Sequence, residues 1–384
     1  MLELKKIISF KKILILLAFF VLYYLLVIKP YVVMYNGSWQ MEADLAEEIK
    51  ERYGLTLLPD EFTMLKAQKP VYEPGETDNF IAGNTEYTSL HIYSLRELLD
   101  GIGKGRFTLE EENRLWFQLH DKVSPDVVSA EMERLIFFDI WDYFIDSYER
   151  EAIRGDVRYE ELTASASARV EMRNQEEVYS PCPRNVVEYN FALLRYFTVF
   201  IMLGATFFVM PYMVSENRSR MPALQCSFRK GRSYYRNRLA AVVGTVLVIA
   251  ILVCILYAVC AKQDRVFVFW DCPISGFASG FIGWLPWTLG SYTISALLFA
   301  TLASVGLSMM VFVITSYLSS HVSAIAWQLP VVVFSILYGG FLLFKFGEIH
   351  KPLFIAPAVG ISVFAVGLIA VFVQGRVEKK KDMV

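Results

Sequence analysis

Residues 272–344 read CPISGFASGFIGWLPWTLGSYTISALLFATLASVGLSMMVFVITSYLSSHVSAIAWQLPVVVFSILYGGFLLF, and none of these 73 residues is Asp, Glu, Lys or Arg. A helix needs about 20 mostly apolar residues to cross the roughly 30 Å of hydrocarbon in a bilayer. An uncharged stretch of this length is long enough for two or three such helices. With a hydrophobic content of 55% and a mean hydropathy of +0.40, it indicates a membrane protein. The same composition excludes a disordered chain, a collagen-like fibre and a small disulfide scaffold.

Four further apolar segments lie outside this stretch. The first is Ile13–Ile28, which reaches full spanning length if residues 31–35 continue the helix past Lys29 and Pro30. A secretory signal peptide is the alternative for this segment, but no small-residue cleavage site follows it. The other three segments are Phe191–Val214, Leu239–Ala261 and Leu353–Val373.

Positive charge is concentrated in three segments that flank the spans. Residues 5–12 hold four lysines, residues 216–238 hold seven Lys and Arg against one Glu, and residues 376–381 hold four Lys and Arg. The positive-inside rule places all three in the cytoplasm. Both chain ends then lie on one side, which requires an even number of spans. The uncharged stretch is therefore predicted to hold two, at about Ser291–Tyr317 and Val322–Phe344. We expect a multi-pass protein of the cell membrane with six spans and both termini cytoplasmic.

This topology divides the chain into four predicted parts. Residues 1–35 form a cytoplasmic tail and the first span, and residues 36–190 form an extracellular domain. Residues 191–374 contain five spans, with a cytoplasmic loop at 215–238 and an outer segment at 272–290. Residues 375–384 form a basic cytoplasmic tail. The outer segment contains two prolines and two tryptophans, Pro273, Pro286, Trp284 and Trp287, which predict a short re-entrant or interfacial element.

The predicted extracellular domain is acidic and mainly helical. From Tyr35 to Asn190 the chain carries 16 Lys and Arg against 32 Asp and Glu, and about 155 residues suffice for a separate core. Apolar residues at helical spacing predict a helix over Trp39–Tyr53, and Thr108 with Glu111 forms a capping box that opens another. Pro125 suits the first turn of a third helix. The stretch Lys69–Gly83, rich in Pro and Gly, predicts a loop. The fold class is thus an all-α polytopic membrane protein with a mainly helical extracellular domain.

The sequence contains no pattern of catalytic or metal-binding residues. The histidines of the outer domain, His91 and His120, stand far apart with no Cys or carboxylate at metal spacing, and His321 stands alone at a predicted turn. Neither Gly-x-Ser-x-Gly nor His-Glu-x-x-His occurs. The spans lack an Asp pair or a Ser-Lys pair, which argues against an intramembrane enzyme. We therefore expect no enzymatic activity, cofactor, metal or nucleic-acid partner for this chain.

Two further features of the membrane part bear on function. Arg195 is the only ionisable residue well inside an apolar run, four residues after its start, and we expect its long side chain to reach the outer interface. Cys182 and Cys272 are the two cysteines predicted outside both the spans and the cytoplasm. Their position leaves open both a disulfide and a pair of thiols.

The cytoplasmic loop at 215–238 has the pattern of a short amphipathic helix. Pro222 suits its first turn, and Met221, Leu224 and Phe228 form an apolar edge that ends before Gly231. Seven basic residues exceed what orienting the helices requires. The loop is therefore predicted to dock onto a cytoplasmic partner. The alternative is a basic loop that lies on anionic membrane lipid.

The order of residues in this loop resembles the type-2 ABC exporter permease family. In that family a glutamate follows the second span, then come a short coupling helix, a Gly-Arg pair and a basic residue before the third span. Glu216, Leu224, Ser227, Gly231-Arg232 and Arg238 follow that order. The chain departs from the family pattern at Arg220, often Gly, and at Arg238, often Lys. The six predicted spans and the large outer insertion between the first two also resemble members of this family.

The resemblance implies a permease subunit of an ABC exporter that moves a hydrophobic or amphiphilic substrate, such as a peptide, an antimicrobial or a lipid. Its partners would be ABC ATP-binding subunits, a second permease subunit and membrane lipid. ATP would bind the partner subunit, because this chain has no phosphate-binding loop. The expected contacts with the ATPase are Glu216, Met221, Leu224, Phe228, Gly231 and Arg232. The alternative is a multi-span sensor or anchor whose outer domain binds a ligand.

Overall fold

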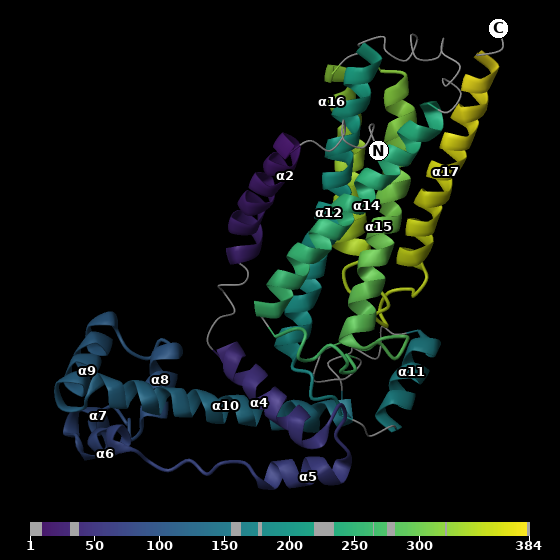
Figure 1. Ribbon diagram of the computed structural model, residues 1–384. Helices are drawn as coiled ribbons and strands as arrows, with labels where there is room; N and C mark the ends of the chain where they lie inside the picture. Colours follow the sequence, from purple (N-terminus) through teal and green to yellow (C-terminus); the bar gives the residue numbers. More distant parts are fainter. Residues whose placement is uncertain are drawn as a thin grey trace. The chain divides into compact units, whose positions relative to one another are not determined.

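The computed structural model of the 384-residue chain consists of helices joined by turns and loops, with no strand among its described residues beyond isolated bridges (Figure 1). The chain divides into two compact units. We call residues 36–155 the outer unit, after their predicted location, and the remainder the membrane unit. The structure describes residues 10–30, 38–154, 163–175, 179–218, 234–263, 265–274, 281–318 and 321–381.

Five helices of the membrane unit are long and apolar enough to cross a bilayer. Each coincides with one of the predicted segments from the second to the sixth, so the interpretation as an α-helical polytopic membrane protein is confirmed at this level. The fourth of them continues from its α-helix into a π-helix, η4 (Tyr338–Leu342). The five are α12 (Arg184–Arg218), α14 (Tyr234–Gln263), α15 (Leu289–Ser316), α16 (His321–Leu337) with η4, and α17 (Ile355–Lys381).

The first predicted span is shorter than the others. Helix α2 (Phe10–Tyr23) continues into the π-helix η1 (Tyr24–Ile28), and its apolar part covers Ile13–Ile28. Residues 31–35, which would lengthen it, lie outside the described residues. The helix packs on α12 through aromatic rings: Phe20 lies 5.7 Å from Phe197 and 5.2 Å from Phe200, centroid to centroid. A sixth span therefore stays a prediction.

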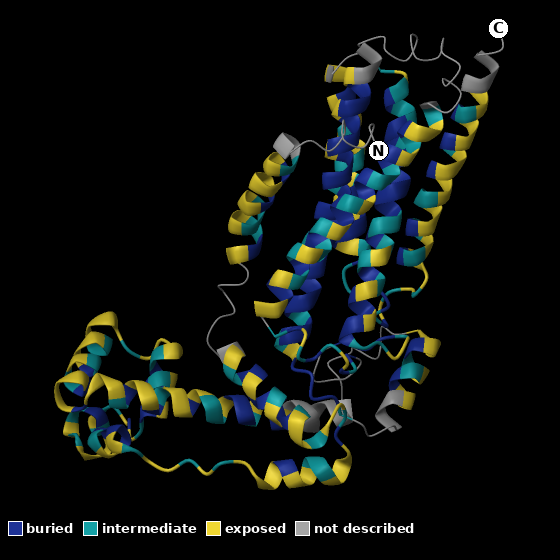
Figure 2. Cartoon of the chain, in the orientation of Figure 1, coloured by how far each residue is buried: buried dark blue, intermediate teal, exposed yellow. Residues whose placement is uncertain are grey.

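Helix α12 is the most enclosed helix of the bundle (Figure 2). Within its most apolar window 78% of the residues are buried, against 22% for α16 and for α17. Helices α15 and α17 approach each other closely at two glycines. A Cβ on Gly306 would lie 2.6 Å from the Phe364 Cα, and one on Gly367 would lie 2.5 Å from the Gly306 carbonyl oxygen. Small residues are thus what allows these two helices to pack.

Irregular segments close one end of the bundle, which we call the capped end: residues 265–274, 281–288 and 343–354. Backbone hydrogen bonds join them, from Leu289 N to Cys272 O at 3.0 Å, Trp284 N to Gly347 O at 2.9 Å and Ile349 N to Ile282 O at 2.8 Å. The described part of the predicted re-entrant segment belongs here and is not helical before Leu289. Residues 275–280 of that segment lie outside the described residues.

A buried polar network and an aromatic cluster lie beneath the capped end. Asn190 of α12 accepts from the Tyr257 hydroxyl of α14 and donates to Thr293 Oγ1 of α15 at 3.0 Å. The ring of Tyr292 lies 4.9 Å from Phe191 and 4.7 Å from Phe346. These contacts tie three spanning helices to the capping segments.

The outer unit is helical, as predicted. Three of its helices begin or extend where the sequence indicates, including α9, whose N-cap Thr108 forms the expected capping box with Glu111. Its core is mainly aliphatic, with Leu98, Leu115 and Leu119 among its members, and also buries the ring of Tyr87. The helices are α4 (Ser38–Tyr53), α5 (Pro59–Ala67), α6 (Glu76–Gly83), α7 (Thr85–Ser89), α8 (Leu95–Gly103), α9 (Leu109–Lys122) and α10 (Pro125–Arg154).

Two features of the outer part differ from the sequence-based picture. The stretch Lys69–Gly83 is a loop only as far as Gly75, since α6 follows. In addition, residues 156–190 group with the membrane unit instead of the outer unit. Helix α11 (Ala164–Gln175) in this segment buries Ala166 and Val170 against Ile282 and Ile349 of the capped end.

Candidate functional site

The predicted coupling residues fall almost entirely outside the described part of the chain. Met221, Leu224, Phe228, Gly231 and Arg232 lie in residues 219–233, which the structure does not describe. Glu216 lies in the last turn of α12, which ends at Arg218, and α14 begins at Tyr234. The contact of this loop with an ATPase therefore stays a prediction.

Arg238, the last residue of the predicted loop, is buried among three helices. Its Nη2 lies 3.2 Å from Met213 Sδ of α12, and its guanidinium lies 5.7 Å from the ring centroid of Phe312 in α15. Nearby, the Tyr235 hydroxyl donates to the Val371 carbonyl oxygen of α17 at 2.7 Å. The beginning of α14 is thus bound to α12, α15 and α17.

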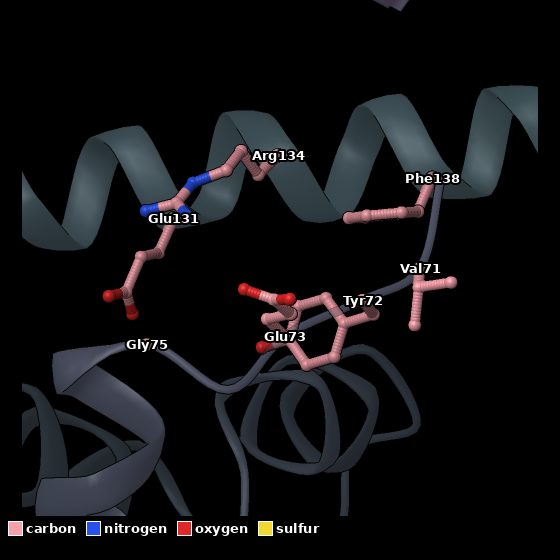
Figure 3. A pocket seen from close by; sticks show the side chains of 7 residues that line it. All are labelled: Val71, Tyr72, Glu73, Gly75, Glu131, Arg134 and Phe138. Carbon is pink, nitrogen blue, oxygen red and sulfur yellow. The ribbon is translucent and has the colours of Figure 1, made fainter. Parts of the chain in front are cut away.

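The outer unit contains a pocket of about 130 Å³ (Figure 3). Its wall combines carboxylates, an arginine and two aromatic rings, with Tyr72 edge-on to Phe138 at 5.5 Å. Burial, together with the hydrogen bond to Asp78, raises the pKa of the Tyr72 hydroxyl. The lining residues are Val71, Tyr72, Glu73, Gly75, Glu131, Arg134 and Phe138.

One carboxylate of this pocket, that of Glu131, already accepts hydrogen bonds from the protein backbone. Glu131 is 5% exposed and accepts the backbone N–H groups of Glu76 at 2.8 Å and Thr77 at 3.1 Å. It therefore caps the first turn of α6 from α10, where the helix dipole favours a negative charge. A Cβ on Gly75 would lie 1.9 Å from Glu131 Oε1, so a larger residue there would displace this carboxylate.

The capped end gathers three cations around one aromatic ring. The Phe344 centroid lies 5.4 Å from the Arg195 guanidinium, 5.9 Å from Lys345 Nζ and 5.6 Å from Lys351 Nζ. Distances below about 6 Å are attractive, because the face of an aromatic ring is electronegative. We call Arg195, Lys345, Lys351 and Phe344 the cationic cluster.

Two members of the cationic cluster have polar partners in the protein. Lys345 forms an ion pair with Glu188 at 2.7 Å. Lys351 Nζ donates to the carbonyl oxygens of Phe341 at 3.3 Å and Phe344 at 2.5 Å, which are free because the helix ends there. Burial lowers the pKa of Lys351 and raises the pKa of the neighbouring Glu348.

Arg195 differs from the two lysines. Its guanidinium lies over the rings of Phe341, at 5.3 Å, and Phe344. Among the residues that the structure describes, no carboxylate or hydrogen-bond acceptor reaches it. Arg195 stands out in the sequence as an isolated charge, whereas Lys345 and Lys351 do not, since only the return of the chain after η4 brings them to α12.

Cys182 and Cys272 are both buried at the capped end and are thiols in the structure. Their segments are adjacent, since Ser180 Oγ donates to the Pro273 carbonyl oxygen at 2.6 Å. No group of His, Cys, Asp and Glu suited to a metal ion occurs within the described ranges. Comparison with protein-family models, with curated proteins and with solved structures gives no match for this chain.

Proposed function

We propose that this chain is the membrane permease subunit of an ABC exporter. The observation that carries the proposal is the basic loop between α12 and α14 together with Arg238 at its end. A loop that transmits force from an ATPase must be bound firmly to the spanning helices. Arg238 meets this requirement, because it is buried against Met213 of α12 and Phe312 of α15. Motion of the loop is then passed to three helices at once.

In this mechanism the chain binds no nucleotide itself. Separate ATP-binding subunits hydrolyse ATP and push on residues 216–232, and a second permease subunit, the same or homologous, forms the other wall of the path. The cargo is hydrophobic or amphiphilic, in keeping with spans in which aromatic and small residues predominate. With six spans, both chain ends are cytoplasmic and the outer unit is extracellular.

The coupling interface is tested by changing both Leu224 and Phe228 to Asp. Charge on the apolar edge should abolish co-purification of the ATPase and abolish transport, while insertion into the membrane is unchanged. A matched control is Leu109→Asp with Phe117→Asp, two apolar side chains of α9 that are 74% and 75% exposed. An ATPase that still co-purifies with the loop variant at the wild-type level would overturn the proposal.

The topology is tested by single cysteines introduced at Asn79 and at Ser227. In intact cells a membrane-impermeant maleimide should label the first and spare the second, because the positive-inside rule places them on opposite sides. The native cysteines are replaced by Ser beforehand, so that only the introduced thiol reacts. Labelling at position 227 before the cells are opened would contradict six spans.

The second candidate is a sensor whose outer unit binds a ligand, and the pocket beside Tyr72 and Arg134 favours it. The two functions differ in their need for an ATPase. A sensor should respond to its ligand without any co-purifying ATP-binding subunit, and Arg134→Ala should abolish that response. An exporter should lose transport with the loop variant, whatever happens at the pocket.

A further inference from the structure

We propose that Arg195, supported by Lys351, binds the phosphate of an anionic membrane lipid in the leaflet at the capped end. The proposal rests on the placement of these cations beside an exposed aromatic side chain, Phe341. The inference concerns the chain itself and does not depend on the exporter mechanism.

The first step concerns the charge of Arg195. A guanidinium carries five N–H donors and stays protonated in proteins. It lies over the faces of Phe341 and Phe344, at 5.3 and 5.4 Å, and no carboxylate reaches it within the described residues. Aromatic faces attract a cation, but they do not replace normal hydrogen-bond acceptors for its N–H groups. A charged residue inside a spanning helix is costly unless it is paired, so an acceptor from outside the chain is expected.

The second step concerns the chemistry of that acceptor. The planar guanidinium matches the oxygens of a phosphate, with two parallel hydrogen bonds. Lys351 brings a second positive charge to the same Phe344 ring, at 5.6 Å. Two of its three N–H donors serve the carbonyl oxygens of Phe341 and Phe344, which leaves one for a ligand. Lys345 is engaged with Glu188, and Lys351 also lies near the carboxyl group of Glu348, so Arg195 supplies the main charge that balances the ligand and Lys351 assists it.

The third step concerns depth. Arg195 lies four residues after Phe191, where the apolar run of α12 begins, which places it about 6 Å along the helix axis. Headgroups occupy a layer about 5 to 7 Å thick on each side of the hydrocarbon. A long side chain that points toward the capped end reaches this layer. The guanidinium therefore meets phosphates of lipids in preference to ions of the bulk solution.

The fourth step concerns the acyl chains. Beside the cationic cluster, η4 and α16 present apolar side chains on the outside of the bundle. Phe341 is 55% exposed, and Ile336 and Leu337 on the preceding turn are also exposed. A lipid whose phosphate contacts Arg195 can lay its chains along this surface. The site thus has a charged end and an apolar wall, as an anionic phospholipid requires.

The test uses the full chain, purified in a neutral detergent and titrated with phosphatidylglycerol or phosphatidylcholine. Native mass spectrometry counts the retained lipid, and thermal unfolding reports stabilisation by it. The wild-type protein should retain phosphatidylglycerol preferentially and be stabilised by it. Arg195→Gln should lower that affinity about tenfold, the loss typical of a charged hydrogen-bond pair. Arg195→Lys keeps the positive charge but loses the planar guanidinium, so its affinity for phosphatidylglycerol should lie between those of the wild type and Arg195→Gln.

Arg376→Gln is the matched control. Arg376 of α17 also lies over an aromatic ring, that of Phe372 at 4.4 Å, but outside the cationic cluster. It should leave the phosphatidylglycerol preference unchanged. Equal losses in the Arg195 and Arg376 variants would overturn the proposal in favour of unspecific charge attraction.

Two further measurements distinguish a lipid site from a site for soluble anions and from a structural role of Arg195. Inorganic phosphate in excess over the lipid should not displace it. If phosphate at the same concentration as the lipid displaces it, the site binds soluble anions and the proposal is wrong. In lipid-free detergent Arg195→Gln should unfold at or above the wild-type temperature, because an unpaired charge is removed. If Arg195→Gln fails to fold, the test uses Arg195→Lys instead. An Arg195→Lys variant that binds phosphatidylglycerol with the wild-type affinity would exclude a bidentate contact between the guanidinium and the phosphate.

Discussion

In the outer unit, α8, α9 and α10 meet through aliphatic side chains such as Leu98, Leu115 and Leu135, whereas α15 and α17 of the membrane unit meet at Gly306 and Gly367. Side-chain hydrogen bonds join helices in both units, from Tyr257 to Asn190 and from Asn190 to Thr293 in the membrane unit and from α6 to Glu131 of α10 in the outer unit. Both units are helical, but they use different residues to bring helices together.

The difference follows from the solvent around each unit. In water, burying aliphatic surface stabilises a core by about 25 cal/mol per Å². In a bilayer that gain is absent between spanning helices, because lipid chains are as apolar as leucine. Close backbone approach and internal hydrogen bonds take its place. The comparison predicts that the two units respond to opposite kinds of substitution, and four changes test it, from the largest expected effect to the smallest.

Gly306→Leu should have the largest effect. The new side chain would meet backbone atoms of Phe364 and Val363 at 2.6 Å, which cannot move without displacing α17. We expect the membrane unit to lose about 3 kcal/mol or more of stability from overpacking, measured by thermal unfolding in detergent. Gly103→Leu in the outer unit is the control, since nothing lies within 4 Å of its Cβ position. Equal tolerance at both glycines would contradict the comparison.

Leu115→Ala should destabilise the outer unit by about 2 to 5 kcal/mol, because it leaves a cavity in an aliphatic core. Leu115 is fully buried, and Phe117 on the same helix is exposed, so Phe117→Ala serves as the control. Limited proteolysis followed by mass spectrometry should show faster cleavage in residues 36–155 alone. Faster cleavage throughout the membrane unit would mean that the two units do not unfold separately.

Asn190→Leu should cost the membrane unit about 1 kcal/mol, within the range measured for hydrogen bonds between spanning helices. The change leaves the Tyr257 hydroxyl without its acceptor, so adding Tyr257→Phe should recover part of the loss. Thermal unfolding of the single and double variants gives the coupling between the two residues. Strictly additive losses would show that the network contributes nothing beyond packing.

Glu348→Gln should change the pH dependence of stability at the capped end. Burial raises the pKa of Glu348 above 4.5, despite the nearby Lys345 and Lys351. The folded chain therefore holds this proton more tightly than the unfolded chain. That contribution is present below pH 4.5 and is lost as the pH rises through the folded pKa. Unfolding temperatures from acid to neutral pH should fall less steeply for the Gln variant, and parallel curves would contradict the shift.

Much of the helical architecture was predictable from short segments of sequence. Each spanning helix forms its backbone hydrogen bonds within itself and must be apolar over its whole length. The segments beginning at Phe191, Leu239, Ser291, Val322 and Leu353 were predicted on that ground, and the structure has apolar helices there. The predicted cap at Thr108 is present for a similar reason, since a capping box involves only four neighbouring residues.

Features that depend on distant residues were not predictable in this way. Residues 76–83 belong to a stretch whose Pro and Gly predict a loop, yet they form α6, because Glu131 on α10 caps their first turn. The candidate site shows the same limit. Arg195 stands out in sequence as an isolated charge, but its neighbours Lys345 and Lys351 lie 150 and 156 positions away along the chain.

The sequence by itself determined that this is a helical membrane protein with an acidic, helical insertion, since hydropathy, charge and capping are properties of short segments. Only the tertiary structure decided that α12 is the most enclosed helix, that two glycines bring α15 and α17 together, and that three cations surround Phe344. Those outcomes depend on which helix faces meet. Spans that are apolar on every side do not encode that choice in their periodicity.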